Sequence, residues 1–208
     1  MRDLVLKMHL SIDGFVAGPN GEVDWIFSSL DPAATEWVVA TLRGAGLHAM
    51  GRRTFRDMEA HWPTSDEPYA APMNAIPKVV FSRHGPEEAR PTTESANAVR
   101  GAAGPQPATS APHGQSWAQA RVVTGDLSEE IATLKREPGK PILAHGGAAI
   151  AQDLVRRGLV DEFRLMIHPV ALGGGPPLFA KLPAPLDLRL VSSTAFPAGA
   201  VAQVYRRA

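Results

Sequence analysis

The sequence predicts an α/β fold with a central, mostly parallel sheet, helices on both faces and an antiparallel hairpin at the C-terminal end. Short apolar segments typical of strands alternate with segments whose apolar spacing fits helices. Strands that alternate with helices form parallel sheets covered on both faces. The last two strand-like segments instead flank the turn sequence Pro197-Ala198-Gly199, which favours a hairpin. With 208 residues, the chain fits a single domain, residues 1–208, with a sizeable core.

Alternation, caps and turn formers predict each element in order. Leu4–Leu10 alternates as a strand does, and a loop rich in turn formers follows it. Asp31 before Pro32 predicts a helix start, because a carboxylate caps free N–H groups and proline suits the first turn. Asp126 is expected to cap a later helix in the same way, which Pro138-Gly139 then ends. The predicted strands are Leu4–Leu10, Leu47–Met50, Pro77–Arg83, Arg121–Val123, Pro141–Ala144, Glu162–Pro169, Leu186–Thr194 and Val201–Arg207, and the predicted helices are Pro32–Leu42, Thr54–Glu59, Leu127–Glu137 and Ala149–Arg157.

Residues 84–119 break this pattern. They are dominated by Ala, Gly, Pro, Ser and Thr, and their large apolar residues are Val99 and Trp117. A segment of this composition buries too little apolar surface to fold by itself. We therefore expect a flexible insertion at 84–119 that interrupts the domain without dividing it, and that serves either as a lid or as an inert excursion.

Composition excludes several classes of function. Lys plus Arg total 21 and Asp plus Glu total 21, so net charge offers no argument for a nucleic-acid or membrane partner. The absence of cysteine excludes disulfides, thiolate metal sites and cysteine nucleophiles. The histidines lack metal-binding spacing, so we expect no metal. No transmembrane or signal-peptide pattern occurs, and the expected location is cytoplasmic.

Two glycine-bearing segments carry the strongest functional signal. Met50-Gly51-Arg52-Arg53-Thr54 and His145-Gly146-Gly147-Ala148 each follow an apolar strand and lead into a helix. Glycine lets a backbone approach a phosphate, and the N–H groups at a helix start face its charge. Taken singly, each segment is explained as a tight turn for helix packing, with the arginines solvated. Together with Ser82-Arg83 at the end of another strand, they favour a nucleotide crevice at the carboxyl edge of the sheet.

These segments, in their order and spacing, resemble the dihydrofolate reductase-like superfamily. More narrowly, the chain resembles standalone relatives of the riboflavin biosynthesis reductase domain, the RibD C-terminal domain. The resemblance covers most of the chain outside 84–119. The matching segments are Lys7–Gly18, Met50–Phe55, Lys78–Arg83, Pro141–Gln152 and Leu159–Phe179.

The resemblance implies a dihydrofolate reductase-like fold with NADPH lying across the sheet. It assigns one group of residues to the adenosine half with its 2′-phosphate, a second to the pyrophosphate and a third to the nicotinamide. These groups are, respectively, Gly51, Arg52, Arg53, Thr54, Ser82 and Arg83; Gly146, Gly147, Ala148, Ala149 and Ile150; and Ile12, Val16 and Ala17. The resemblance also implies a homodimer, and it raises the expectation of a cis bond between the two glycines of the second turn.

The identity of the catalytic acid is open from the sequence. Folate reductases of this superfamily use a carboxylate in the first helix, and the nearby acids here are Asp24, Asp31 and Glu36. Asp31 has an alternative role as a helix cap, and Asp24 has one as a solvated loop residue. His145 and His168, at strand ends, are either site residues or buried structural histidines.

The sequence thus predicts an NADPH-dependent reductase that transfers a hydride to a C=N or C=O bond of a small heterocyclic, pterin- or pyrimidine-like substrate. Riboflavin-pathway reductases carry a basic residue after the Asp-Gly pair, where this chain has Phe15, so the substrate is open between dihydrofolate and a ribosylamino-pyrimidine. The alternative class is a nucleotide-binding module that has lost its chemistry and serves as a sensor or scaffold.

Overall fold

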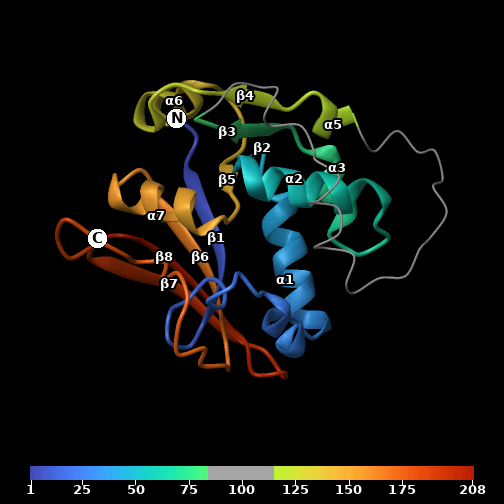
Figure 1. Ribbon diagram of the computed structural model, residues 1–208, viewed down its shortest axis with the longest axis vertical. Helices are drawn as coiled ribbons and strands as arrows, with labels where there is room; N and C mark the ends of the chain where they lie inside the picture. Colours follow the sequence, from blue (N-terminus) through green and yellow to red (C-terminus); the bar gives the residue numbers. More distant parts are fainter. Residues whose placement is uncertain (84–114) are drawn as a thin grey trace.

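A single sheet organises the structure, a computed structural model that describes residues 1–83 and 115–208 (Figure 1). It is an 8-stranded sheet in the order β4-β3-β2-β5-β1-β6-β8-β7. From β4 to β6 every neighbouring pair is parallel, whereas β8 pairs antiparallel with both β6 and β7. The expected mostly parallel sheet with a C-terminal antiparallel hairpin is confirmed. The strands are β1 (Leu4–Ser11), β2 (Leu47–Gly51), β3 (Lys78–Phe81), β4 (Arg121–Val123), β5 (Ile142–Ala144), β6 (Glu162–His168), β7 (Leu188–Ala195) and β8 (Val201–Arg207).

Helices cover both faces of the sheet, as expected. Figure 1 shows α6 and α7 on one side of β1, and α1, α2 and α3 on the other. None of the helices that the structure describes is long and apolar enough to cross a membrane. The helices are α1 (Pro32–Arg43), α2 (Arg52–His61), α3 (Ala70–Ala75), α5 (Gln115–Ala118), α6 (Leu127–Arg136) and α7 (Ala148–Arg156), with 3-10 turns η1 (Asp24–Ser29) and η2 (Trp62–Thr64).

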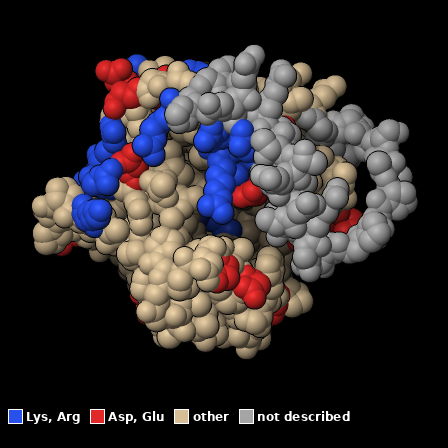
Figure 2. All heavy atoms as spheres, in the orientation of Figure 1, with Lys and Arg blue, Asp and Glu red and all other residues tan. Residues whose placement is uncertain are grey.

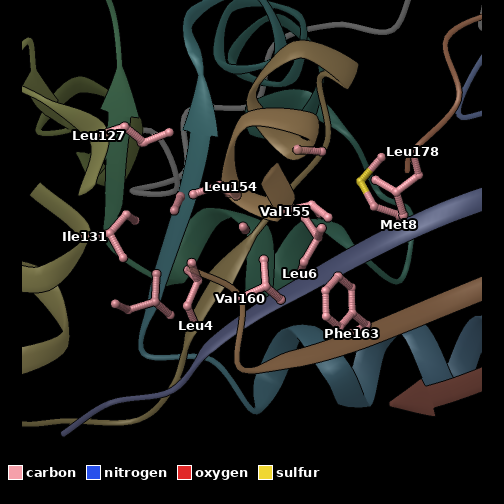
Figure 3. Packing of buried hydrophobic residues seen from close by; sticks show 14 of the residues in the cluster. Leu4, Leu6, Met8, Leu127, Ile131, Leu154, Val155, Val160, Phe163 and Leu178 are labelled. Carbon is pink, nitrogen blue, oxygen red and sulfur yellow. The ribbon is translucent and has the colours of Figure 1, made fainter. Parts of the chain in front are cut away.

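Successive side chains of β1 point to opposite faces of the sheet and contribute to the hydrophobic core on each face. Leu4 and Leu6 are buried in one core with residues of α6 and α7, and Met8 lies beside Leu178 in the same core, as Figure 3 shows, while Val5 belongs to the core under α1. Burying a side chain of this kind contributes roughly 1.5–3 kcal/mol. Because helices lie on both faces, the polar residues of β1 are also at least partly buried. This placement matters for Lys7, which is considered below.

The predicted helix caps are confirmed. Asp31 accepts a hydrogen bond from the backbone N–H of Ala34, and Asp126 accepts bonds from those of Ser128 and Glu129. Each carboxylate satisfies N–H groups that have no partner within the helix. These local signals fixed the starts of α1 and α6 at the expected residues.

The expected insertion at 84–119 is too long at its C-terminal end. Residues 84–114 lie outside the described residues, but 115–118 form α5, and Trp117 is only 2% exposed. Its Nε1–H donates to Asn74 Oδ1 at 2.6 Å, and its ring contacts Phe55. A buried indole of this kind requires an ordered partner surface, which α2 and α3 provide. Trp117 is therefore a core residue.

Candidate functional site

The two glycine turns meet at the carboxyl edge of the sheet. Gly51 ends β2 and Gly147 precedes α7, and β2 pairs directly with β5. A Cβ on Gly147 would lie 2.8 Å from Thr54 Oγ1, and a Cβ on Gly51 would lie 3.5 Å from Ile150 Cγ2. The turns are therefore in mutual contact, and side chains in place of these glycines would fill the space between them.

Both turns open onto a helix N-terminus without a capping side chain. Gly51 is the N-cap of α2, and Gly147, with a φ of +95°, is the N-cap of α7. The free N–H groups of such a terminus attract anions. In α2 the first turn also contains Arg52 and Arg53, whose charges oppose the helix dipole unless an anion lies nearby. The pair of turns is thus suited to a ligand with more than one phosphate.

The bond between Gly146 and Gly147 is trans, because the described residues contain no cis peptide bond. The expected cis bond is therefore wrong. The positive φ of Gly147 lets the backbone turn. At Gly146 the backbone lies close to the Met8 side chain, since a Cβ on Gly146 would lie 3.1 Å from Met8 Cε. Glycine is therefore favoured at position 147 by the positive φ, with a trans bond, whereas a side chain at position 146 would require Met8 to shift.

A third strand end lies at the same edge. Ser82 and Arg83 follow β3, the other neighbour of β2, and Ser82 N–H donates to the carbonyl of Val123 at 3.0 Å. Ser82 is buried and Arg83 is exposed. Figure 2 shows several Lys and Arg side chains, with Asp and Glu among them, in the upper half of this view. The structure therefore places the residues expected to hold the adenosine half and the pyrophosphate at one edge.

The loop after β1 is fixed against the segment after β6. Asp13 accepts hydrogen bonds from Ser11 Oγ at 2.6 Å, Gly173 N–H at 2.7 Å and Leu172 N–H at 3.1 Å. These bonds, that from Ser11 foremost, lower the pKa of Asp13 and keep its carboxylate charged. The acid therefore connects the loop after β1 to the segment after β6.

The expected nicotinamide contacts lie on this tied loop. Ile12 is 68% exposed, whereas Val16 is buried in the core beside α7. The carbonyl of Ala17 packs so closely on Gly175 that no side chain fits there. Ile12 is thus the residue of the three with a largely exposed side chain, whereas Val16 is buried within the loop.

The three acids considered as catalytic candidates do not form a cluster. Asp31 accepts hydrogen bonds from Ala34 N–H at 2.9 Å and from Ala198 N–H at 2.8 Å, and these bonds lower its pKa. It is a structural cap that also holds the turn between β7 and β8. Asp24 and Glu36 are exposed, in η1 and on α1 respectively.

A chain of basic side chains lies on the α1 face of the sheet instead. Lys7 Nζ is 2.5 Å from His9 Nε2, and His9 Nδ1 is 2.8 Å from His168 Nε2. His168 Nδ1 is in turn 2.7 Å from the hydroxyl of Ser29 in η1. The ring of Trp25, also in η1, stands edge-on to His168 with centroids 5.4 Å apart. We call Lys7, His9, His168 and Ser29 the basic chain.

Most of the basic chain was not predicted from the sequence, although the positions of Lys7 and His9 in the first strand gave one indication. Lys7 and His9 occupy the alternate positions of β1, between Leu6, Met8 and Leu10. In a sheet covered on one face these positions would be solvated. Because helices cover both faces here, polar residues on both sides of a strand become interior. The predicted two-sided covering therefore already implied that these groups are enclosed.

Enclosure controls the charge of the basic chain. Burial lowers the pKa of Lys7 to about 7 and that of His168 to about 4. Burial first, and then the neighbouring Lys7 and His168, hold the pKa of His9 well below its usual value. Both rings are consequently neutral at pH 7. The same face holds His145 and His48, whose ring centroids are 4.5 Å apart and whose pKa values burial lowers as well.

Strand order, the glycine turns at the carboxyl edge and the C-terminal hairpin define a dihydrofolate reductase-like fold. The chain belongs to the RibD C-terminal domain family, whose profile matches residues 2–202.

Known proteins resemble the chain over its whole length. It is 31% identical over 204 residues to the uncharacterized protein YyaP of Bacillus subtilis, covering 98% of this chain and 94% of that protein. A Shewanella sp. PV-4 protein, provisionally assigned to riboflavin biosynthesis, superimposes with a TM-score of 0.70 at 25% identity, covering 100% of this chain and 99% of the other. A pyrimidine reductase-like protein from Corynebacterium diphtheriae has a TM-score of 0.62 at 17% identity, with coverages of 100% and 92%. This last likeness concerns the fold alone.

Proposed function

We propose that the protein is an NADPH-dependent reductase that transfers a hydride to a C=N or C=O bond of a small heterocycle. Membership of the RibD C-terminal domain family supports a reductase. The observation that carries the proposal is the contact between Gly147 and Thr54. It brings two uncapped helix N-termini, one of them with two arginines in its first turn, to one edge of the sheet.

The residues at this edge fit the cofactor. NADPH combines a pyrophosphate with a 2′-phosphate, and when bound it supplies the hydride from its nicotinamide ring. The N-terminus of α7 suits the pyrophosphate, because its free N–H groups follow a glycine that leaves room for close approach. Arginine side chains of α2 suit the 2′-phosphate, since a guanidinium binds phosphate through two parallel N–H groups. We assign the adenosine half to Gly51, Arg52, Arg53, Thr54, Ser82 and Arg83, the pyrophosphate to Gly146, Gly147, Ala148, Ala149 and Ile150, and the nicotinamide to Ile12, Val16 and Ala17.

The charge of the basic chain favours a neutral or anionic substrate. Lys7, His9 and His168 all lose proton affinity through burial, and among the described residues no acidic side chain is hydrogen-bonded into their chain. A cationic pterin would need a buried carboxylate as its partner. Of the three candidate acids, Asp31 is used as a cap, and Asp24 and Glu36 are exposed. A pyrimidine-like substrate with carbonyl groups is therefore preferred to dihydrofolate.

We also propose that the protein forms a homodimer through the edge of its sheet. β7 is the outermost strand at one of the two edges of the sheet, and from Arg189 to its end every residue is exposed. Leu190 and Val191 are each 49% exposed there. An uncovered edge strand with apolar side chains is a pairing surface. Light scattering on the purified protein and on a Leu190→Lys variant tests this, because the charge should yield a monomer.

Fluorescence titration with NADPH and NADH tests the reductase proposal. Trp25 packs on His168 beside the proposed site, so its emission should change when the cofactor binds. We expect selective binding of NADPH, followed by oxidation of NADPH when a carbonyl-bearing pyrimidine is added. Binding without turnover of either pterins or pyrimidines would favour a nucleotide-binding sensor or scaffold. Failure to bind either nucleotide would overturn both functions.

A further inference from the structure

The strand order indicates where the second half of a dinucleotide lies. Along the carboxyl edge of the parallel part of the sheet, the strands follow one another as β3, β2, β5, β1 and β6. The proposed function assigns the adenosine half to the turns after β3 and β2, and the pyrophosphate to the turn after β5. In NADPH the pyrophosphate lies between adenosine and nicotinamide, so the nicotinamide half should continue in the same direction, over the ends of β1 and β6.

Two segments follow these two strands and are bonded to each other. The first is residues 12–18 after β1, and the second is residues 170–178 after β6; we call them the paired loops. Phe15 and Pro177 form an antiparallel bridge between them. Backbone bonds between them run from Ile12 N–H to the Val170 carbonyl at 2.8 Å, from Val16 N–H to the Pro176 carbonyl at 3.0 Å and from Leu178 N–H to the Gly14 carbonyl at 3.1 Å. The paired loops therefore form one continuous wall.

Asp13 joins the paired loops through its side chain. Oδ1 accepts from Leu172 N–H at 3.1 Å and Oδ2 accepts from Gly173 N–H at 2.7 Å, so one carboxylate binds two successive N–H groups of the opposite segment. Ser11 Oγ also donates to Oδ1, at 2.6 Å, which fixes the rotation of the carboxylate. Hydrogen bonds to a charged acceptor are stronger than bonds to a neutral one, so the ionised carboxylate holds the two segments together.

Burial separates this connection from the core. Val16 and Leu178 are buried in the core on the α7 side of the sheet, whereas Asp13 and Gly173 are exposed. If the carboxylate is lost, water can solvate the exposed N–H groups, and the buried anchors of both segments remain. The loss should therefore change the position and mobility of the exposed part of the wall far more than the global stability.

The second of the paired loops is also bonded to α7. Gln152 Nε2–H donates to the Pro177 carbonyl at 2.7 Å. Because α7 begins directly after Gly147, this helix is the one whose N-terminus suits the pyrophosphate. Residues 170–178 are thus attached to the pyrophosphate helix on one side and to the loop after β1 on the other.

We propose that Asp13 is a positioning residue of the reduction, which holds the paired loops in the arrangement that orients the nicotinamide half of NADPH for hydride transfer. This inference rests on the proposed reductase function. Asp13 acts through Leu172 and Gly173 on the opposite segment, and through Ile12, which lies between Ser11 and Asp13 in the loop after β1. Its loss should impair hydride transfer and leave the adenosine half of the site unaffected.

Amide hydrogen exchange of the cofactor-free protein tests the connection itself. In Asp13→Asn an NH₂ group replaces one acceptor oxygen, so exchange at Leu172 and Gly173 should become faster while the urea midpoint changes little. Asp126→Asn is the matched control, because Asp126 is also an exposed carboxylate that accepts backbone N–H groups, at the start of α6. It should leave both amides unchanged. Unchanged exchange in Asp13→Asn would overturn the proposal.

Two nucleotides then separate the halves of the site. Adenosine 2′,5′-bisphosphate lacks the nicotinamide, so its Kd should be the same in the wild type and in Asp13→Asn. NADPH, but not the bisphosphate, should slow exchange in the paired loops of the wild type, and Asp13→Asn should lose this protection. With a carbonyl-bearing pyrimidine as substrate, kcat of Asp13→Asn should fall by about 10²-fold, the cost of misplacing reacting groups by about 1 Å. Gln152→Met, which removes the attachment to α7, should act in the same direction.

The outcomes distinguish the positioning role from the reductase function. NADPH protection or a kcat that is as high in Asp13→Asn as in the wild type would overturn the positioning role and leave the reductase in place. A weaker affinity of Asp13→Asn for the bisphosphate would also overturn it, because the effect would not be confined to the nicotinamide half. If the wild type binds neither nucleotide, both statements fall, and faster exchange in Asp13→Asn would leave Asp13 with a structural role only.

Discussion

Gly147 and Thr54 belong to different turns, yet they touch. A Cβ on Gly147 would lie 2.8 Å from Thr54 Oγ1, which is closer than Cβ atoms tolerate, and the φ of +95° at Gly147 is strained for any other residue. This contact is what turns two separate glycine motifs into one site. It can be tested without knowledge of the substrate.

We expect Gly147→Ala to destabilise the protein by about 1–3 kcal/mol, the cost of one strained backbone position, and to weaken NADPH binding. A second substitution, Thr54→Ala, should relieve the close contact and restore part of the stability but not the backbone strain. Urea unfolding monitored by circular dichroism gives both values. Gly44→Ala, at an ordinary φ with its nearest contact at 3.4 Å, is the control. Equal effects of the two glycine substitutions would contradict the proposed geometry.

Replacement of Arg53 by Ala should distinguish the two nicotinamide cofactors. A charge-assisted bond to phosphate is worth about 1.5–3 kcal/mol, so the Kd for NADPH should rise by about 10- to 100-fold. NADH lacks the 2′-phosphate, and its Kd should change much less. Arg52→Ala should behave similarly, and Arg189→Ala on the exposed strand β7 should change neither Kd. Equal losses for both nucleotides would place the 2′-phosphate elsewhere.

The burial of Trp117 predicts that α5 is required for stability. Trp117→Ala should lower the free energy of unfolding by about 3–5 kcal/mol, as large-to-small changes in a core do. Trp117→Phe keeps an aromatic ring beside Phe55 but loses the hydrogen bond to Asn74, so its effect should be smaller. Thermal or urea unfolding measures both. A loss below about 1 kcal/mol for the alanine variant would show that α5 does not belong to the core.

His168 should make stability depend on pH. Burial lowers its pKa from 6.5 to about 4, so between these values the unfolded chain binds a proton that the folded chain does not. Its contribution is fully present above pH 6.5 and is lost as the pH falls towards 4, on the order of 3 kcal/mol in total. His168→Gln should reduce the slope of this part of the stability profile, and the slope that remains should come from His9, His48 and His145, whose pKa values burial also lowers. A wild-type profile that is flat across this range would contradict the prediction.

Local signals in the sequence predicted the elements well, because caps and alternation act over a few residues. Asp31 and Asp126 marked their helices, and β1 followed its apolar alternation. The short helices α3 and α5 were not predicted, since Trp117 is ordered by Asn74, far away in the sequence. A segment read by composition alone cannot reveal such a partner.

The candidate site was likewise predicted only in part. The glycine turns were visible because glycine is needed wherever a backbone must turn or approach closely. The basic chain was not, because His9 and His168 meet only when β1 and β6 are paired. The search for a carboxylate followed the resemblance to folate reductases, whereas the enclosed groups in this chain are bases.

The interior position of β1 has a consequence for biosynthesis. β1 precedes every other described strand, yet its two neighbours, β5 and β6, begin only at Ile142 and Glu162. During synthesis on the ribosome, β1 therefore remains unpaired, with its apolar side chains exposed, until most of the chain has been translated. Codon changes that slow translation between these strands should therefore prolong the interval in which nascent chains are bound by chaperones, and deletion of β6 should leave a nascent chain that cannot complete its sheet.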